Sequence, residues 1–309
     1  MHIRKKGFTL LELMVVVAII AVIASVMMGG FFGASESANQ AKCLVNMKNL
    51  FSLVNAKAMA SGYYPPAQSY EYVDLSSGKE VYRQHRGWIG WNAPETAYDQ
   101  EDSAGQYADS SRASSSWRVS LAGDETATYT AITNSSIWKT SGGNVSSYVC
   151  PSHKKQAASA GYSPAWSYVM NSAFRYDSSG SNKPDSKWLK QYGSISSPHK
   201  LLMFAEVPFI DTGRQKAIKA SSSSSDSALD SVLQYDDKVW NGKEENIAFN
   251  HAVDGKTMTA HICFADGHTE KIVYPSQDSN LKDLTKWLCS GTDIQFVSGR
   301  YKNSEDEEE

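Results

Sequence analysis

The sequence lacks the motifs and the charge imbalance that mark most enzymes and nucleic-acid-binding proteins. Its 30 basic and 33 acidic residues nearly balance, so no basic surface for nucleic acid is predicted. There is no Gly-x-Ser-x-Gly elbow, phosphate-cradling glycine loop, zinc-protease histidine pair or calcium loop of alternating acidic residues. We therefore expect a chain that is not an enzyme, a secreted hydrolase included, and that uses no cofactor.

One long apolar segment lies near the start of the chain. Between residues 13 and 28 the only polar side chain is Ser25, and the apolar character extends to Phe32. As a helix this run can cross roughly 30 Å of bilayer hydrocarbon. The basic residues at positions 4–6 predict a cytoplasmic N-terminus, with the rest of the chain facing outward.

A single carboxylate, Glu12, stands at the start of this apolar segment. A carboxylate near a bilayer interior costs on the order of 2–3 kcal/mol, which indicates a function unless the side chain reaches the headgroups. In a secretory signal the cleavage site follows the apolar run, whereas here the small residue Gly7 precedes it. Cleavage after Gly7 would leave the helix on the mature chain and give Phe8 a free amine. That amine could pair with Glu12 of a neighbouring subunit, which would favour one stagger between packed helices.

The stretch from Lys5 to Leu13 resembles the N-terminal signature of type IV prepilins and type II secretion pseudopilins. In that family a basic leader and a glycine precede Phe-Thr-Leu-Leu-Glu-Leu. The resemblance implies cleavage between Gly7 and Phe8 by a prepilin peptidase, N-methylation of Phe8, and a role for Glu12 in subunit assembly. It also implies a single-pass protein of the inner membrane that joins other pilin or pseudopilin subunits, of its own or another kind. The heads of such filaments lie in the periplasm or outside the cell.

The helix is expected to continue beyond the apolar segment. Glycines at positions 29, 30 and 33 are poor helix formers and predict a local kink or melted turn. The chain after them shows the three- and four-residue spacing of one helix face, which we expect to pack on the protein's own sheet. Gly62, followed by two prolines, ends the helix. The residues of this predicted face are Leu44, Met47, Phe51, Val54 and Ala58.

The four cysteines, at positions 43, 150, 263 and 289, are too widely spaced for a metal knuckle. They belong to the part expected to face an oxidising compartment, where disulfides form. Four cysteines allow three pairings, and the sequence does not decide between them. We favour Cys43 with Cys150, because Cys43 lies beside the inward helix face and Cys150 closes a short apolar strand at 148–149. Cys263 would then pair with Cys289, and four buried free thiols are the alternative.

We predict an α+β fold in which the long N-terminal helix packs on an antiparallel β-sheet. The leader would be residues 1–7, the helical spine 8–62, the globular head 63–300, and an acidic disordered tail 301–309. A run of apolar residues at 201–205 predicts a buried strand. Further predictions are a strand region at 81–91, a turn at 141–144, and loops at 99–116, 176–185 and 220–227.

A second informative region follows residue 250. β-prone runs at 257–264 and 269–274 flank Asp266-Gly267, a strong hairpin signal because glycine tolerates positive φ. With the segments 43–48 and 148–152, this region resembles a pseudopilin-like group common in planctomycetes, whose C-terminal element has a histidine before Phe-Ala-Asp-Gly-His. The spacing departs from that pattern, because His251 lies further from the turn and His261 nearer to it. Which of the two is equivalent stays open.

Several side chains in this region have the chemistry of zinc ligands. They are His251, His261, Asp266 and His268. A tight turn explains the last two more simply, because an aspartate there can accept hydrogen bonds from backbone amides. We therefore assign no metal from the sequence and keep these four residues as candidates.

An alternative function is a surface-binding or adhesive module displayed on such a filament. Its aromatic and serine-rich loops would contact glycan or cell wall, and the candidates are Trp88, Trp91, Trp117 and Trp138. Burial of these tryptophans in a β-rich domain would speak against that role.

Overall fold

The structure is a computed structural model of the whole chain. It describes residues 9–67, 70–75, 79–84, 87–89, 130–159, 166–174, 191–206, 232–233, 247–253, 257–274, 279–291, 294–297 and 300–303. Gly7, Phe8 and the loops predicted at 99–116, 176–185 and 220–227 lie outside the described residues.

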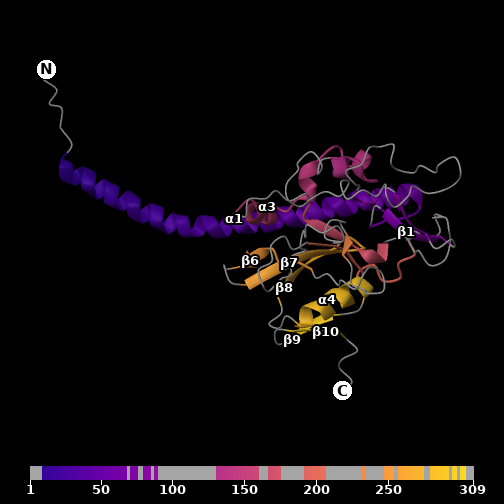
Figure 1. The fold of residues 1–309 in the computed structure, drawn as a ribbon. Helices are drawn as coiled ribbons and strands as arrows, with labels where there is room; N and C mark the ends of the chain where they lie inside the picture. Colours follow the sequence, from indigo (N-terminus) through magenta and orange to yellow (C-terminus); the bar gives the residue numbers. More distant parts are fainter. Residues whose placement is uncertain are drawn as a thin grey trace.

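Helix α1, Leu10–Ser61, is 52 residues long and dominates the molecule (Figure 1). Thr9 caps its start, and Gly62 ends it with φ 79° and an N–H that donates to the carbonyl of Ala58. The helix is continuous through the glycines at 29, 30 and 33, so the predicted melted turn is wrong. Each glycine costs up to about 1 kcal/mol, which a helix already propagated on both sides can absorb. The chain bends gently instead, as Figure 1 shows.

The N-terminal part of α1 projects away from the head. Its apolar side chains are exposed in every direction around the axis, because the consecutive residues 13–17 are each 45–65% exposed. From the apolar run at residues 13–28 we expect a membrane-spanning segment in this helix. Within the described residues, no helix meets the length and apolar character that a membrane span needs.

The head is built on a sheet whose strands run in the order β5-β3-β4-β7-β6, with β8 also paired to β7. All pairs are antiparallel except β3 with β5. This confirms the predicted α+β class and antiparallel sheet, including the buried strand near 201–205 and the hairpin after residue 256. The strands are β3 Tyr168–Asn171, β4 Leu202–Glu206, β5 Val232–Leu233, β6 His251–Val253, β7 Thr257–Phe264 and β8 Thr269–Val273.

Strand β7 sets the positions of its neighbours. Strand β4 pairs with residues 262–264 of β7, whereas β6 pairs with residues 257–259. Strand β8 pairs with residues 259–263, which overlap both ranges, so β8 occupies one edge of β7 while β4 and β6 share the other. The end of β4 and the start of β6 therefore meet on the same edge of β7.

Two helices cover the two faces of this sheet. Helix α1 lies over one face and helix α4, Ser279–Ser290, lies over the other (Figure 1). Side chains of β7 alternate between the two layers, with Cys263 in the core under α1 and Ile262 in the core under α4. Because His261 and Thr259 share the parity of Cys263, they also face α1.

The remaining elements differ in part from the sequence predictions. Residues 148–149 do not form a strand, because the Asn144 side chain accepts a hydrogen bond from Ser146 N and starts a 3-10 turn. The strand region predicted at 81–91 ends at Gln84. Residues 301–303, predicted to belong to the disordered tail, pair with residues 294–296 in a hairpin, since the charge run begins only at Glu305. These elements are β1 Tyr70–Leu75, β2 Lys79–Gln84, η3 Trp138–Thr140, η4 Val145–Tyr148, α3 Pro151–Ser159, η5 Ser172–Phe174, β9 Ile294–Val297 and β10 Arg300–Asn303.

Candidate functional site

The first turn of α1 holds Glu12 in a defined position. Thr9 donates to Glu12 Oε2 from its backbone N at 2.8 Å and from its hydroxyl at 2.9 Å. In return, Glu12 N donates to the Thr9 hydroxyl at 3.3 Å, which completes a capping box. The carboxylate is exposed, at the start of the apolar part of the helix. Gly7 and Phe8, the predicted processing residues, precede the described part of the chain.

The second half of α1 packs on the sheet, with its buried face rotated slightly from the predicted one. Met47 is fully buried as expected, but Phe51 is only partly buried and Leu50 takes the central position. The rotation also turns Cys43 and Asn46 into the head. Asn46 Nδ2 donates to the carbonyl of Val149 at 3.0 Å, which ties α1 to the segment before helix α3.

The turn between β7 and β8 rests against α1. Gly267 has φ 89°, and a Cβ there would overlap the ring of Phe51. Asp266 Oδ1 accepts a hydrogen bond from His268 N at 3.0 Å, as expected for an aspartate in a turn. The His268 ring pairs with the Asp266 carboxylate and stacks on Phe264 with centroids 4.2 Å apart. Asp266 and His268 thus satisfy one another locally at a partly exposed turn.

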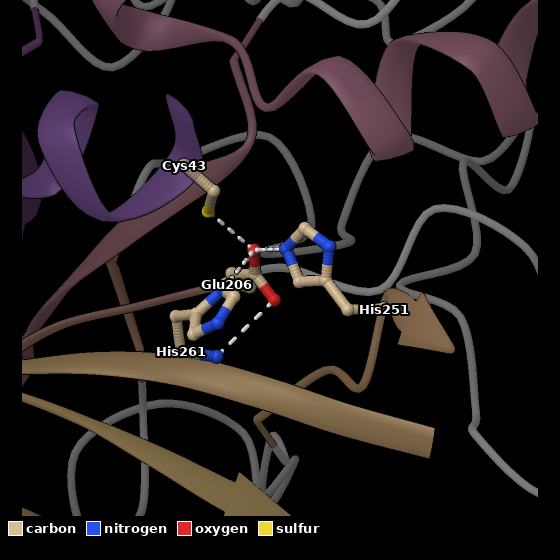
Figure 2. A group of neighbouring side chains, drawn as sticks. All are labelled: Cys43, Glu206, His251 and His261. Carbon is tan, nitrogen blue, oxygen red and sulfur yellow. Dashed lines mark hydrogen bonds and ion pairs between the residues drawn. The ribbon is translucent and has the colours of Figure 1, made fainter. Parts of the chain in front are cut away.

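A buried polar cluster lies between α1 and the sheet. It comprises Cys43 of α1, Glu206 at the end of β4, His251 at the start of β6 and His261 in β7 (Figure 2). All four residues are at most 1% exposed. Their meeting follows from the sheet, because the end of β4 and the start of β6 lie on one edge of β7. Ala248 N, just before β6, donates to the Glu206 carbonyl at 3.0 Å and holds the two ends together.

One carboxylate oxygen, Glu206 Oε1, is the centre of this cluster. The Cys43 thiol donates to it at 2.7 Å, and His251 Nε2 lies 2.8 Å from it. His261 Nδ1 lies 4.0 Å from the same oxygen, and His261 N donates to Oε2 at 3.5 Å. The two imidazole rings are neighbours, with centroids 4.4 Å apart. Figure 2 shows the three side chains converging on Glu206 from different elements.

A second layer of polar groups surrounds the cluster. His251 Nδ1 faces Glu36 Oε1 of α1 at 3.0 Å, and Ser152 of α3 donates to the same Glu36 oxygen at 2.8 Å. Cys150 Sγ lies 3.6 Å from His251 Nε2. The hydroxyl of Tyr168 donates to Cys43 Sγ at 3.3 Å. Three parts of the chain, α1, residues 150–152 and β3, therefore add polar groups around the buried cluster.

The electrostatics of the cluster follow from burial and close pairing. Burial alone would raise the pKa of Glu206, but the charge and hydrogen bond of His251 outweigh it, so the pKa lies below its usual value. Burial alone would lower the pKa of His251, but the facing Glu206 carboxylate raises it to about 11. Burial lowers the pKa of His261 to about 4 and raises that of Cys43 well above its usual value. In the absence of a metal ion, the cluster is thus an ion pair between the His251 imidazolium and the Glu206 carboxylate. The neutral His261 imidazole and the Cys43 thiol flank this pair.

The structure divides the four histidine and aspartate candidates from the sequence. His251 and His261 come together, whereas Asp266 and His268 pair with each other in the β7–β8 turn. Glu206, the partner of both histidines, was not predicted from the sequence. The signal that could have indicated it is a carboxylate directly after the apolar run 201–205. A charged residue directly after a buried strand is either exposed by a turn or satisfied by buried partners.

The four cysteines are buried free thiols in this structure. The thiols of Cys43 and Cys150 lie close together, and the Cys43 thiol lowers the pKa of Cys150. Cys263 belongs to the core under α1 and Cys289 to the core under α4. The sheet therefore separates Cys263 from Cys289, the second favoured pair. Cys43 and Cys150, the first favoured pair, lie in the same core.

Two of the tryptophans named for surface binding lie in the described part of the chain. Trp88 is fully buried, and its ring packs on Tyr148 and Phe204 with centroids 6.3 and 5.0 Å away. Trp138 is partly buried against the same core. Trp91 and Trp117 lie outside the described residues. Trp88 is thus a core residue.

Comparison with known proteins gives two similarities. The family described as "Prokaryotic N-terminal methylation motif" matches residues 3–28. The "Type II secretion system core protein G" of Pectobacterium carotovorum subsp. carotovorum is 34% identical over 65 residues, which are 21% of this chain and 42% of that protein. The chain thus spans less than half the length of this curated relative, and no solved structure matches. For a chain whose head is carried on one long N-terminal helix, the two similarities support the type IV pilin and pseudopilin family.

Proposed function

We propose that the chain is a structural subunit of a type IV pilus-like or type II secretion pseudopilus filament. The observation that carries this proposal is the N-terminal part of α1, which projects from the head with apolar side chains on all sides. A helix that is apolar all round has to be buried, either in lipid or among other apolar helices. A filament core of such helices, with the heads outside, buries it completely.

Maturation would prepare this helix for assembly. A prepilin peptidase and methyltransferase would cut between Gly7 and Phe8 and methylate the new amine. The match of the methylation motif to residues 3–28 supports this step. Before assembly, the apolar part of α1 would lie in the inner membrane with its N-terminus in the cytoplasm and its head in the periplasm.

Glu12 would guide the incorporation of each subunit. Both hydrogen bonds from Thr9 reach Glu12 Oε2, so among the described contacts Oε1 is open to a further partner. The amine of Phe8 on a neighbouring subunit is a cation in the same apolar layer. Pairing the two charges removes the penalty of burying either one alone, and does so at only one stagger between helices. The protein would act by this assembly and not by catalysis.

Replacing Glu12 with alanine tests this role. The Glu12→Ala chain should still enter the membrane fraction, because the substitution makes the helix more apolar. Its incorporation into filaments should fall by about tenfold or more, since an unpaired buried charge costs several kcal/mol. Immunoblots of membrane and sheared-filament fractions measure both quantities.

Ser25→Ala is the matched control within the same apolar segment. The Ser25 hydroxyl bonds to the Val22 carbonyl of its own helix at 2.7 Å, so its loss should leave incorporation unchanged. If Glu12→Ala chains enter filaments as well as Ser25→Ala chains do, the carboxylate does not set the stagger.

A further inference from the structure

The buried cluster has the shape of a closed four-ligand metal site. One ligand atom from each of Cys43, Glu206, His251 and His261 lies within 4.8 Å of the others. A tetrahedral zinc ion, with bonds of about 2.0–2.3 Å, holds its ligand atoms about 3.3–3.8 Å apart. In Figure 2 the other three side chains converge on Glu206, and small side-chain rotations would bring the four ligand atoms to that spacing.

The donor set matches the preferences of zinc. One thiolate, two imidazole nitrogens and one carboxylate are the ligand types that Zn²⁺ takes in proteins. The thiolate and the carboxylate together carry two negative charges, which neutralise a divalent ion in a site with no exposed member. Four protein ligands leave no open position, which is typical of structural and not catalytic zinc.

His261 supplies an observation that hydrogen bonding within the protein does not explain. Its Nδ1 is buried and has no hydrogen-bond partner among the described residues, although it faces Glu206 Oε1 from 4.0 Å. Leaving a buried ring nitrogen unsatisfied costs about 1–3 kcal/mol. A metal ion between this nitrogen and the Glu206 carboxylate would satisfy both groups.

His251 is oriented as metal-binding histidines usually are. Its Nε2 points to the centre of the cluster, and its Nδ1 lies 3.0 Å from Glu36 Oε1. Histidine ligands of metals almost always donate their second ring N–H to a carboxylate, a carbonyl or water, which fixes the tautomer and the ring plane. Ser152 in turn holds the Glu36 carboxylate at 2.8 Å.

We propose that Cys43 Sγ, a Glu206 carboxylate oxygen, His251 Nε2 and His261 Nδ1 bind one structural Zn²⁺ ion. On binding, Cys43 gives up its thiol proton and His251 the proton on Nε2, and both protons pass to solvent. The ion joins α1 to β4, β6 and β7, so it fastens the projecting helix to the head. The site lies between the second half of α1 and the sheet, and it is independent of the filament function, which rests on the first turn of α1.

Metal binding to the purified full chain tests the proposal. The chain is kept in detergent with a reducing agent, stripped with a chelator and titrated with Zn²⁺ or Co²⁺. We expect one equivalent of Zn²⁺ to remain after dialysis and to raise the thermal midpoint by about 5–10 °C when Zn²⁺ is well above its dissociation constant. Co²⁺ should give the visible bands of a tetrahedral site and a thiolate-to-cobalt charge-transfer band.

Four variants separate this site from its alternatives. Cys43→Ser should lose the charge-transfer band, whereas Cys289→Ser, which removes an equally buried thiol, should keep it. Cys150→Ser should also keep the charge-transfer band. That result would exclude a disulfide with Cys150 as the role of Cys43. Glu36→Gln leaves all four ligands in place at a partly exposed position and should weaken Zn²⁺ binding by about 10–100-fold.

Less than a tenth of an equivalent of bound Zn²⁺, or a charge-transfer band that survives Cys43→Ser, would overturn the proposal. The cluster would then be a metal-free ion pair between His251 and its two carboxylates. Neither result would alter the behaviour expected of Glu12→Ala, because that variant reports on the other end of α1.

Discussion

Replacing His251 with alanine is expected to lower the free energy of unfolding by about 3–5 kcal/mol, even in the presence of a chelator. Among the described residues, the ion-pair partners of Glu206 are His251 at 2.8 Å and His261 at 4.0 Å. Without His251, the fully buried carboxylate loses its cationic partner and keeps only neutral ones, the Cys43 thiol at 2.7 Å and His261. Chemical denaturation of the full chain in detergent, followed by near-ultraviolet circular dichroism, measures the change.

Two further variants show whether the loss comes from the stranded charge. Adding Glu206→Gln to His251→Ala removes the charge and should recover at least about 1 kcal/mol, so the two changes are not additive. His199→Ala removes an exposed histidine and should change stability by less than about 0.5 kcal/mol. An additive double variant would mean that the His251–Glu206 pair does not hold this part of the head together.

Replacing Gly267 with alanine is expected to destabilise the head by about 2–5 kcal/mol. Its φ of 89° is strained for a residue with a Cβ, which costs about 1–2 kcal/mol. The new methyl would also lie 2.7 Å from Phe51 Cδ1, so the ring must leave its place against the turn. Overpacking of this kind costs about 1–3 kcal/mol. The same denaturation measurement reports the loss.

Gly193→Ala is the matched control, because Gly193 has φ 81° and open space around it. It should show only the backbone penalty of about 1–2 kcal/mol. Adding Phe51→Ala to Gly267→Ala should relieve the overlap, so the double variant should lose less than the sum of the single losses. Equal losses in Gly193→Ala and Gly267→Ala would show that the turn does not press on α1.

Local signals in the sequence were sufficient for the elements that carry the fold. The hairpin around Asp266-Gly267 was predicted because its turn chemistry and its two β-prone runs are adjacent in the chain. The strand near 201–205 was predicted because a short uninterrupted run of five apolar residues is typical of a buried strand. The resemblance of the N-terminal segment to prepilins was found for the same reason, since the basic leader, Gly7, Glu12 and the apolar run are adjacent in the chain.

The buried cluster could not be predicted, because it depends on which strands share an edge. Glu206 and His251 are 45 residues apart, and they meet only because β4 and β6 lie end to end along β7. The contribution of Cys43 depends on the rotation of α1 about its axis. The spacing of apolar residues placed Phe51 on the buried face of α1. In the structure the Asp266-Gly267 turn lies against Phe51, and Leu50 is the residue that is fully buried. Periodicity gives the existence of a buried face more reliably than its direction.

Mass spectrometry of the mature N-terminus tests the filament assignment most directly. The protein is purified from its native cell, and its N-terminal peptide is sequenced by fragmentation. The account predicts that residues 1–7 are absent and that the chain begins at Phe8 with a methyl group on its amine. A chain that retains Met1, or that is cut at any other bond, would contradict it.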